Sequence, residues 1–290
     1  MKSPSRTSPA VSMETELKTL WGASAWPFAA AVQKPYPSKA FTEAYDQLSQ
    51  LFAVKASGVL TGPNGVGKSM LVNALLEQLP QKAYRTIRLA HSSITAADLI
   101  RHLCRVQGIE SSNRRGDNVL ALRKMWQELS PAWPVLIFEE AQNLAVTAME
   151  EIRLLAADRA DTQPPFSLLF VGDENLMARL MLGVNRPLLS RFGFCIQMEV
   201  WSGEDVQAYI RGRLQEVGIH GDVLEPQAEQ LLLQSGGGRP REINNIAQRA
   251  IEHAARAHSK LITSEHIRLA LKQLPWLGRL PEQDDEADGS

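Results

Sequence analysis

Hydrophobic positions along the chain follow two patterns, which change near residue 202. Before it, short unbroken apolar runs alternate with segments whose apolar residues recur every three or four positions. Unbroken runs are typical of buried strands in a parallel sheet, and the second spacing is typical of amphipathic helices. The predicted strands are Val59–Thr61, Tyr84–Ala90, Pro134–Phe138, Phe166–Val171 and Phe194–Val200.

Helices are expected before and between these strands, and after residue 202 only helices are expected. The first group covers Met13–Trp21, Lys39–Phe52, Met70–Leu76, Ala96–Gln107, Asn118–Leu129, Ala148–Arg159 and Leu176–Leu182. This alternation favours an α/β fold with a five-stranded parallel sheet flanked by helices. After Ser202 the pattern predicts a helical lid made of Gly203–Glu216, Glu225–Gln234, Arg241–Arg256 and Thr263–Gln273.

Composition agrees with a globular protein and limits its partners. No apolar run is long enough to span a bilayer, and the first residues lack the apolar core of a signal peptide. We therefore expect a cytoplasmic protein without a membrane segment. The two cysteines, Cys104 and Cys195, are interpreted as buried free thiols, and the histidines show no metal-binding spacing. The net charge is −1 with acidic residues gathered at the end, so a mildly basic body remains that is compatible with nucleic acid.

A glycine loop lies between the first sheet strand and the helix that follows it. It reads Gly62-x-x-x-x-Gly67-Lys68-Ser69, which predicts a phosphate-binding loop. Backbone N–H groups of such a loop and of the helix start wrap a phosphate, while the lysine reaches the outer phosphates and the serine hydroxyl binds Mg²⁺. The residues expected to bind ATP here are Gly62, Pro63, Asn64, Gly65, Val66, Gly67, Lys68, Ser69 and Met70.

Two glutamates end the buried strand Pro134–Phe138. An apolar strand that ends in acidic residues, downstream of a phosphate loop, is the Walker B arrangement. Glu139 is expected to hold Mg²⁺, and Glu140 is expected to orient or deprotonate the attacking water. The alternative is a pair of surface glutamates at a strand end.

Three further polar positions are candidates for contacts with the outer phosphate. Asp173 follows the strand Phe166–Val171 and is either such a contact or a simple turn residue. Arg191, with Arg186 before it, is either a finger for a neighbouring subunit's nucleotide or a surface residue paired with a carboxylate. Arg241 starts a lid helix after three glycines, either over the phosphates or in a capping turn.

Together these segments resemble an AAA+ ATPase over residues 26–273. More narrowly, the chain is similar to the family that joins secretion ATPases of the ExeA type to transposition regulators of the TnsC, TniB and MuB type. The phosphate loop is common to many nucleotidases, whereas Glu140–Leu144 and Gly238–Asn245 are more specific. The other segments that support the resemblance are Trp26–Phe28, Glu151–Leu154, Val171–Gly172, Leu189–Phe192 and Tyr209–Leu214 with Gly218.

The resemblance implies roles for single residues. Arg191 becomes the arginine finger with Arg186 second, Arg241 becomes the sensor-2 arginine, and Asp173 falls at the sensor-1 position. The family more often has an uncharged polar residue at sensor 1, and it normally has aspartate where this chain has Glu139. Because Mg²⁺ requires tight octahedral geometry, the longer glutamate predicts that ATP binds but is hydrolysed slowly.

The resemblance also implies a function in DNA transposition. An ATP-bound homo-oligomer, a hexameric ring or a helical filament, would follow duplex DNA, select the target, and recruit or activate a transposase together with a target-recruiting protein. Contacts with DNA would be independent of base sequence and sensitive to salt. The candidates are Arg85, Arg88, Arg101, Arg105, Arg114, Arg115 and Lys124.

Two other functions stay open. One is a secretion or signalling ATPase of the ExeA type that acts on proteins. That type carries a membrane segment and an envelope-binding domain after its ATPase, so the short sequence after the lid favours transposition. The other is a stand-alone ATP switch in defence against mobile elements. The expected domains are a flexible segment at 1–25, a nucleotide-binding α/β domain at 26–201, the lid at 202–273 and a flexible acidic tail at 274–290.

Overall fold

The computed structural model describes residues 9–28, 34–90, 95–157 and 164–277. The chain divides into two compact units. Of the described residues, those within Lys39–Glu199 form one unit, and those up to Ser38 combine with those from Val200 onward to form the other. Each unit has a hydrophobic core of its own.

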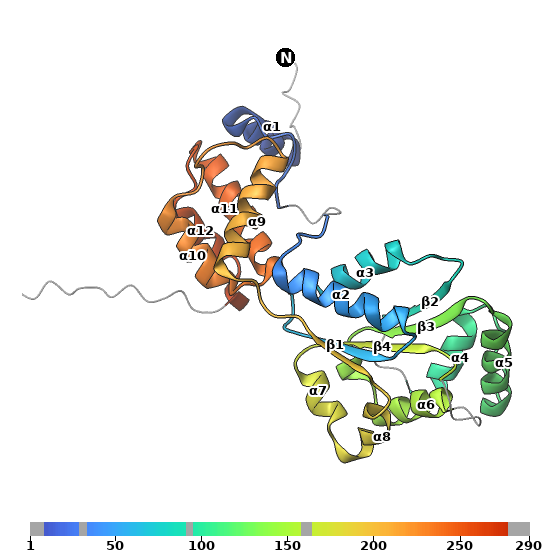
Figure 1. Ribbon diagram of the computed structural model, residues 1–290. Coiled ribbons are helices and arrows are strands. Elements are labelled where there is room, and N and C mark those ends of the chain that lie inside the picture. The colour runs from blue at the N-terminus through green and yellow to red at the C-terminus, as the bar shows by residue number, and fades with distance from the viewer. Residues whose placement is uncertain (1–8, 29–33, 91–94, 158–163, 278–290) are drawn as a thin grey trace, which may run out of the picture. The chain divides into compact units, whose positions relative to one another are not determined.

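A five-stranded parallel sheet forms the centre of the unit Lys39–Glu199 (Figure 1). Its strand order is β2-β3-β4-β1-β5, so β1 lies between β4 and β5. This confirms the predicted α/β fold with five parallel strands. The strands are β1 (Gly58–Thr61), β2 (Tyr84–Leu89), β3 (Trp133–Phe138), β4 (Ser167–Val171) and β5 (Phe194–Gln197).

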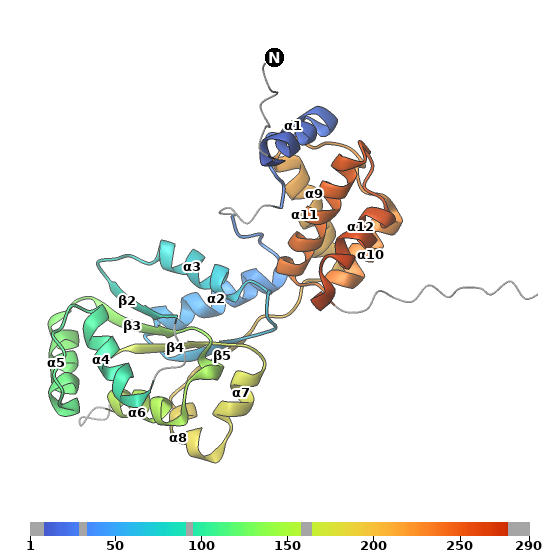
Figure 2. The same cartoon turned by 180° about the vertical axis from the view of Figure 1, so that it is seen from behind.

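Helices cover both faces of this sheet (Figure 2). Successive side chains of a strand point to opposite faces, and β1 shows it: Val59 joins the core under one group of helices, and Leu60 joins the core under the other. On the Leu60 face lie α2 (Lys39–Ala53) and α3 (Lys68–Gln78). On the Val59 face lie α4 (Ala96–Val106), α5 (Arg115–Glu128), α6 (Val146–Ala156), α7 (Asn175–Leu180) and α8 (Arg186–Leu189).

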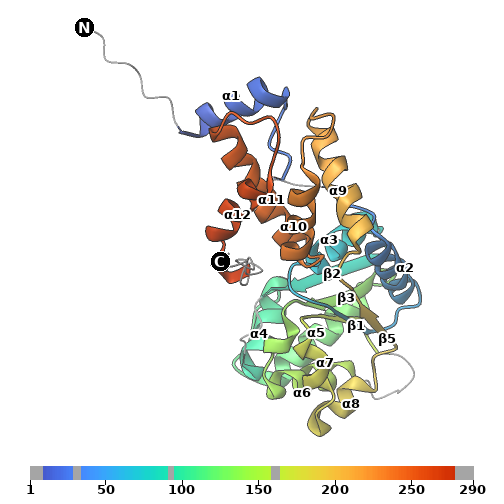
Figure 3. The same cartoon turned by 90° about the vertical axis from the view of Figure 1, so that its left-hand side faces the viewer.

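The second unit is helical (Figure 3). Its main helices are α9 (Gly203–Glu216), α10 (Pro226–Gly236), α11 (Pro240–Arg256) and α12 (Ser264–Lys272), in agreement with the predicted lid. An N-terminal helix, α1 (Pro9–Trp21), packs against α11. The described residues 26–28 and 34–38, which the sequence assigned to the α/β domain, group with the helical unit. Their attachment is specific, because Arg213 donates a hydrogen bond from Nε to the carbonyl oxygen of Pro27 at 2.9 Å.

The motif residues of the helical unit build its core. The Tyr209 hydroxyl donates to Asn244 Oδ1 at 2.7 Å, which joins α9 to α11. Gly238 lies between α10 and α11 with φ of 65°, and a Cβ atom there would be 2.4 Å from the carbonyl oxygen of Trp201. Only glycine allows this approach, so the Gly-Gly-Gly stretch fixes the angle between two helices.

Two sequence expectations change in the sheet unit. β5 ends at Gln197, three residues before the predicted limit at Val200. Cys195 is exposed, so the prediction of a buried thiol is wrong there, although Cys104 is buried as expected. The reason is the strand order, since β5 is an edge strand that buries Ile196 and exposes the residues on either side. Within the described residues, no helix is long and apolar enough to cross a membrane.

Candidate nucleotide-binding site

The glycine loop connects β1 to α3 and requires its glycines. Gly62, Gly65 and Gly67 have φ values of 152°, 87° and 105°, which side-chain-bearing residues rarely adopt. At Gly62 a Cβ atom would also be 2.4 Å from the carbonyl oxygen of Met198, just after β5. The loop is therefore held against β5, with Val66 buried beneath it and Asn64 exposed.

Lys68 starts α3 and folds back over the loop. Its side chain is buried, and Nζ donates to the carbonyl oxygens of Gly62 at 2.7 Å and of Pro63 at 3.0 Å. The backbone N–H groups of Lys68, Ser69 and Met70 are the first three of α3, and a helix offers no carbonyl oxygen to the N–H groups at its start. An ammonium group and helix-start donors thus lie together, which is the arrangement that a bound phosphate needs.

The two residues expected to bind Mg²⁺, Ser69 and Glu139, are in contact with each other. Ser69 Oγ donates to Glu139 Oε2 at 3.1 Å, although the two residues lie on α3 and at the end of β3. Glu139 Oε1 forms an ion pair with Arg88 Nη2 at 2.6 Å, and Arg88 also donates to Asn73 Oδ1. Both donors to a metal would be hard oxygens, which suit Mg²⁺, whose remaining positions water and phosphate oxygens commonly fill. The residues present therefore fit this ion.

Glu140 is held by a residue that the sequence analysis did not single out. Gln142 donates from Nε2 to Glu140 Oε2 at 2.8 Å, and its Oε1 accepts from the backbone N–H of Asp173 at 3.3 Å. Glu140 has a φ of 49°, in the left-handed region. The only signal for Gln142 was its place in the Glu-Ala-Gln-Asn segment that resembles known ATPases.

Asp173 lies at the end of β4, and its carboxylate forms a turn. Oδ1 accepts from the Asn175 backbone N–H at 2.9 Å, and Oδ2 accepts from the Asn175 side-chain amide at 3.2 Å. Both bonds join Asp173 to Asn175, the first residue of α7. They are typical of a turn residue, which is one of the two roles that the sequence left open. A sensor role for Asp173 stays a prediction.

The three candidate arginines lie on the surface of their units. Arg186 is the first residue of α8, and Arg191 follows two residues after its end. Both are exposed, and neither side chain forms an ion pair with any residue that the structure describes. That leaves both free for a partner outside the chain. Arg241, also exposed, is the second residue of α11 in the helical unit, so its role at the phosphates stays a prediction.

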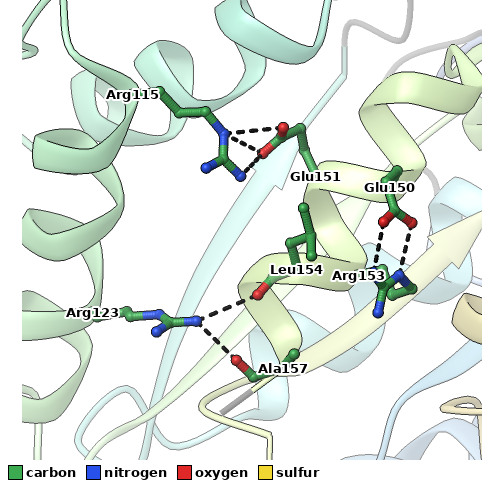
Figure 4. Close-up of polar contacts among 7 residues, drawn as sticks. All are labelled: Arg115, Arg123, Glu150, Glu151, Arg153, Leu154 and Ala157. Atoms are coloured by element: carbon green, nitrogen blue, oxygen red, sulfur yellow. Dashed lines mark hydrogen bonds and ion pairs between the residues drawn. The ribbon is translucent and has the colours of Figure 1, made fainter. Parts of the chain in front are cut away.

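Some of the candidate DNA contacts form ion pairs within the protein, and others do not. Arg88 is bound to Glu139, and Arg115 on α5 forms a bidentate contact with Glu151 on α6 (Figure 4). Arg123 on α5 also binds α6, through the carbonyl oxygen of Ala157 at 2.8 Å (Figure 4). On the surface, Arg101 pairs with Asp98 and Lys124 with Glu128.

The pair at Asp98 has an electrostatic effect, since hydrogen bonds from Thr95 and Arg101 lower the pKa of Asp98. The basic candidates that form no ion pair in the described part of the chain are Arg85, Arg105 and Arg114. Because exposed ion pairs are weak, Arg101 and Lys124 can still exchange a carboxylate for a phosphate. Arg88 and Arg115 instead form ion pairs with Glu139 and Glu151, within the sheet unit.

Parts of this chain are similar in sequence to known proteins. Residues 53–180 match a family model described as an AAA domain. General secretion pathway protein A of Aeromonas hydrophila is 29% identical over 221 residues, which cover 73% of this chain and 39% of that protein. Holliday junction branch migration complex subunit RuvB of Lactobacillus delbrueckii subsp. bulgaricus is 27% identical over 231 residues, which cover 74% of this chain and 58% of that protein. The chain therefore spans less than two thirds of either relative.

A solved structure shares the fold. Cdc6p from Pyrobaculum aerophilum aligns with a TM-score of 0.66 at 18% identity, over 85% of this chain and 70% of that one. At this identity the likeness concerns the fold, which is that of an AAA-type P-loop protein with a helical C-terminal region.

Proposed function

We propose that the AAA-type P-loop ATPase domain of this chain binds ATP with Mg²⁺ and hydrolyses it slowly, as an assembly switch on duplex DNA. The observation that carries the ATPase part is the 3.1 Å contact between Ser69 and Glu139, next to the phosphate loop. It joins the two predicted metal-binding oxygens across β3 and α3, and the Lys68 ammonium lies on the same loop.

Each residue has one role in the proposed hydrolysis. The glycine loop and the start of α3 bind the β-phosphate through N–H groups, and Lys68 turns from its carbonyl partners to the phosphates. Glu140 accepts a proton from water as the water oxygen attacks the γ-phosphorus, and the bond to the oxygen bridging to ADP breaks. Mg²⁺, when bound at Ser69 and Glu139, neutralises phosphate charge during this step.

Slow turnover follows from Glu139. Its carboxylate is one methylene longer than the usual aspartate, and Arg88 binds one of its oxygens at 2.6 Å. A metal ligand that is shared with an arginine approaches Mg²⁺ less freely. We therefore expect long-lived bound ATP, which suits a switch better than a motor.

DNA and a transposase are the proposed partners. The relative RuvB is named as a subunit of a complex that acts on Holliday junctions, which supports action on DNA by an oligomer. The resemblance of the Glu140–Leu144 and Gly238–Asn245 segments to transposition regulators supports the specific role. The exposed basic residues Arg85, Arg105 and Arg114 are the proposed contacts with the DNA backbone.

Electron microscopy tests this proposal directly. The full chain is mixed with duplex DNA at low salt, with ATP or a non-hydrolysable analogue, and inspected for rings or filaments. We expect assembly with the analogue and loss of assembly with ADP. Lys68→Ala is the control and should abolish both nucleotide binding and assembly. No assembly on DNA in any nucleotide state would reject the DNA part of the proposal.

The second candidate function is that of a secretion ATPase. The identity of 29% to general secretion pathway protein A favours it. In that case the chain would hydrolyse ATP, yet DNA would change neither its assembly nor its rate. Measuring phosphate release with and without duplex DNA separates the two candidates.

A further inference from the structure

We propose that Gln142 is a positioning residue that couples Glu140 to the turn after β4, and so links the water-activating carboxylate to the strand beside the phosphate loop. The inference rests on the ATPase function proposed above and names a control element within that site.

The amide of Gln142 joins Glu140 to Asp173, which lies 31 residues after Gln142. Its Nε2 donates to Glu140 Oε2 at 2.8 Å, and its Oε1 accepts from the Asp173 N–H at 3.3 Å. A carboxylate can only accept and a backbone N–H can only donate, so the orientation of the amide is determined. The side chain is buried at 8% exposure, so most of its contacts are with the protein itself.

The end of β4 is shaped to receive this amide. A Cβ atom at Gly172 would lie 2.7 Å from Gln142 Oε1 and 2.7 Å from the side chain of Leu176. Any larger residue would push the amide away from the Asp173 N–H. Gly172 also donates from its N–H to the carbonyl oxygen of Leu60 at 3.0 Å, on the strand that leads into the phosphate loop.

Glu140 needs such a support. Its φ of 49° is uncommon for a residue with a side chain, so surrounding bonds must maintain it. One is the backbone bond from Asn143 N to Glu140 O at 2.9 Å, and the other is the bond from Gln142 to its carboxylate. The first fixes the turn, and the second fixes where the carboxylate lies.

The connection therefore runs from β1 through the β4 turn to Glu140. When the turn at Asp173 shifts, the amide of Gln142 shifts with it, and the Glu140 carboxylate follows. Because hydrolysis depends on placement of the attacking water within a fraction of an ångström, this should affect kcat. The phosphate loop itself makes no bond to Gln142 among the described residues, so ATP affinity should change little.

Two variants test the inference, with a matched control. Gln142→Leu removes both amide bonds at similar size, and Gln142→Glu makes the donor depend on pH. Gln107→Leu is the control, because Gln107 is equally buried, accepts from Trp126 Nε1 at 2.8 Å and donates to Leu103 O at 3.0 Å. Each is measured for ATP affinity, for kcat across pH, and for the urea midpoint of unfolding.

We expect Gln142→Leu to lower kcat roughly 10- to 100-fold, with ATP affinity within about twofold of wild type. The ratio of kcat for Gln142→Glu to that of wild type should fall as pH rises, because the introduced carboxyl group donates to Glu140 only while it is protonated. Gln107→Leu should lower the urea midpoint but leave kcat unchanged. In a Glu140→Gln background, Gln142→Leu should reduce kcat no further.

The outcomes separate this inference from the proposed function. A wild-type chain that neither binds nor hydrolyses ATP overturns both. A wild-type chain that hydrolyses ATP, beside a Gln142→Leu variant with unchanged kcat, overturns only the role of Gln142. So does a loss of ATP affinity or of stability as large as the loss of kcat, or a kcat ratio for Gln142→Glu that is flat with pH.

Discussion

At the residue scale, the two carboxylate oxygens of Glu139 have different partners. Oε2 accepts from Ser69, while Oε1 faces Arg88, which Asn73 also binds. The extra methylene of glutamate lets one carboxylate span the space between a proposed metal ligand and an arginine. We therefore propose that Arg88 belongs to the nucleotide site rather than to a DNA-binding surface.

Shortening this side chain should speed the enzyme. We expect Glu139→Asp to raise the rate of ATP hydrolysis several-fold and to lower the Mg²⁺ concentration needed for half the maximal rate. The shorter carboxylate would leave Arg88 and approach the ion at the position that its octahedral geometry requires. Phosphate release across a Mg²⁺ titration measures both. The exposed Glu77→Asp is the control, and an equal or lower rate for Glu139→Asp would contradict the explanation of slow turnover.

At the element scale, helix ends and helix contacts fix the helical unit. Thr263 and His266 form a capping box at the start of α12, in which His266 Nδ1 accepts from the Thr263 N–H at 3.0 Å. The Gly-Gly-Gly stretch joins α10 to α11 and packs closely against the Trp201 backbone. The sequence located both helix starts but did not indicate which side chains hold them.

The capping box should make stability depend on pH. Burial, and then the nearby His253, lower the pKa of His266, while Glu265 acts in the opposite direction. The neutral ring is thus favoured in the folded state, so its stabilisation is present above the unfolded pKa of about 6.5 and is lost as pH falls through the folded pKa.

We expect the unfolding free energy to fall between pH 8 and pH 5, and to fall less in His266→Gln. Glutamine at this position can form the same capping box without titrating. Burial also lowers the pKa of His253, so part of the dependence should persist. Urea unfolding at several pH values measures this pH dependence, and His220→Gln, at an exposed position, is the control. Equal pH dependence in wild type and His266→Gln would exclude this origin.

Two glycines of the helical unit should respond to alanine in opposite directions. Gly212 lies inside α9, and a Cβ atom there meets nothing within 4 Å, so Gly212→Ala should stabilise by about 1 kcal/mol. Gly238→Ala should destabilise by about 1–3 kcal/mol, because its backbone is left-handed and the Trp201 carbonyl oxygen is close. Denaturant midpoints compare the two. A stabilised Gly238→Ala would show that the junction is not as tight as described.

At the scale of the whole molecule, we propose that a neighbouring subunit completes the nucleotide site. Arg186, at the start of α8, and Arg191, just after α8, are exposed and form no ion pair among the described residues of their own chain. An exposed arginine with no internal partner is available to a neighbouring subunit's nucleotide. In this proposal ATP is the substrate and also bridges two neighbouring subunits.

Removing this arginine should separate binding from hydrolysis. We expect Arg191→Ala to leave ATP affinity nearly intact and to lower the rate of the assembled protein about 1,000-fold or more. The exposed Arg256→Ala serves as control.

Mixing two inactive variants tests whether Arg191 acts between subunits. A Lys68→Ala subunit does not assemble with copies of itself, but an Arg191→Ala subunit holds ATP and can bind it as a neighbour. The Lys68→Ala subunit then offers Arg191 to that ATP, so mixing the two variants should restore part of the rate. An unchanged rate for Arg191→Ala alone would refute the assignment. No recovery on mixing would place Arg191 within its own subunit's site.

The sequence by itself determined the features that local chemistry fixes. Apolar runs gave the five strands, three-to-four spacing gave the helices, and Gly62–Ser69 identified a phosphate loop, because each depends on neighbours along the chain. The same holds for the order of acidic residues after β3. Family resemblance then added roles that no local pattern contains.

Only the tertiary structure decided which distant residues meet. Arg88 joins Glu139 because β2 and β3 are adjacent and in register, and Gln142 joins Asp173 because β4 lies next to β3. The edge position of β5 exposes Cys195, and the hydrogen bond from Arg213 to the Pro27 carbonyl oxygen attaches the Pro27 segment to the helical unit. Strand order and packing between distant segments are properties of the whole chain's lowest free energy, so spacing along the sequence does not encode them visibly.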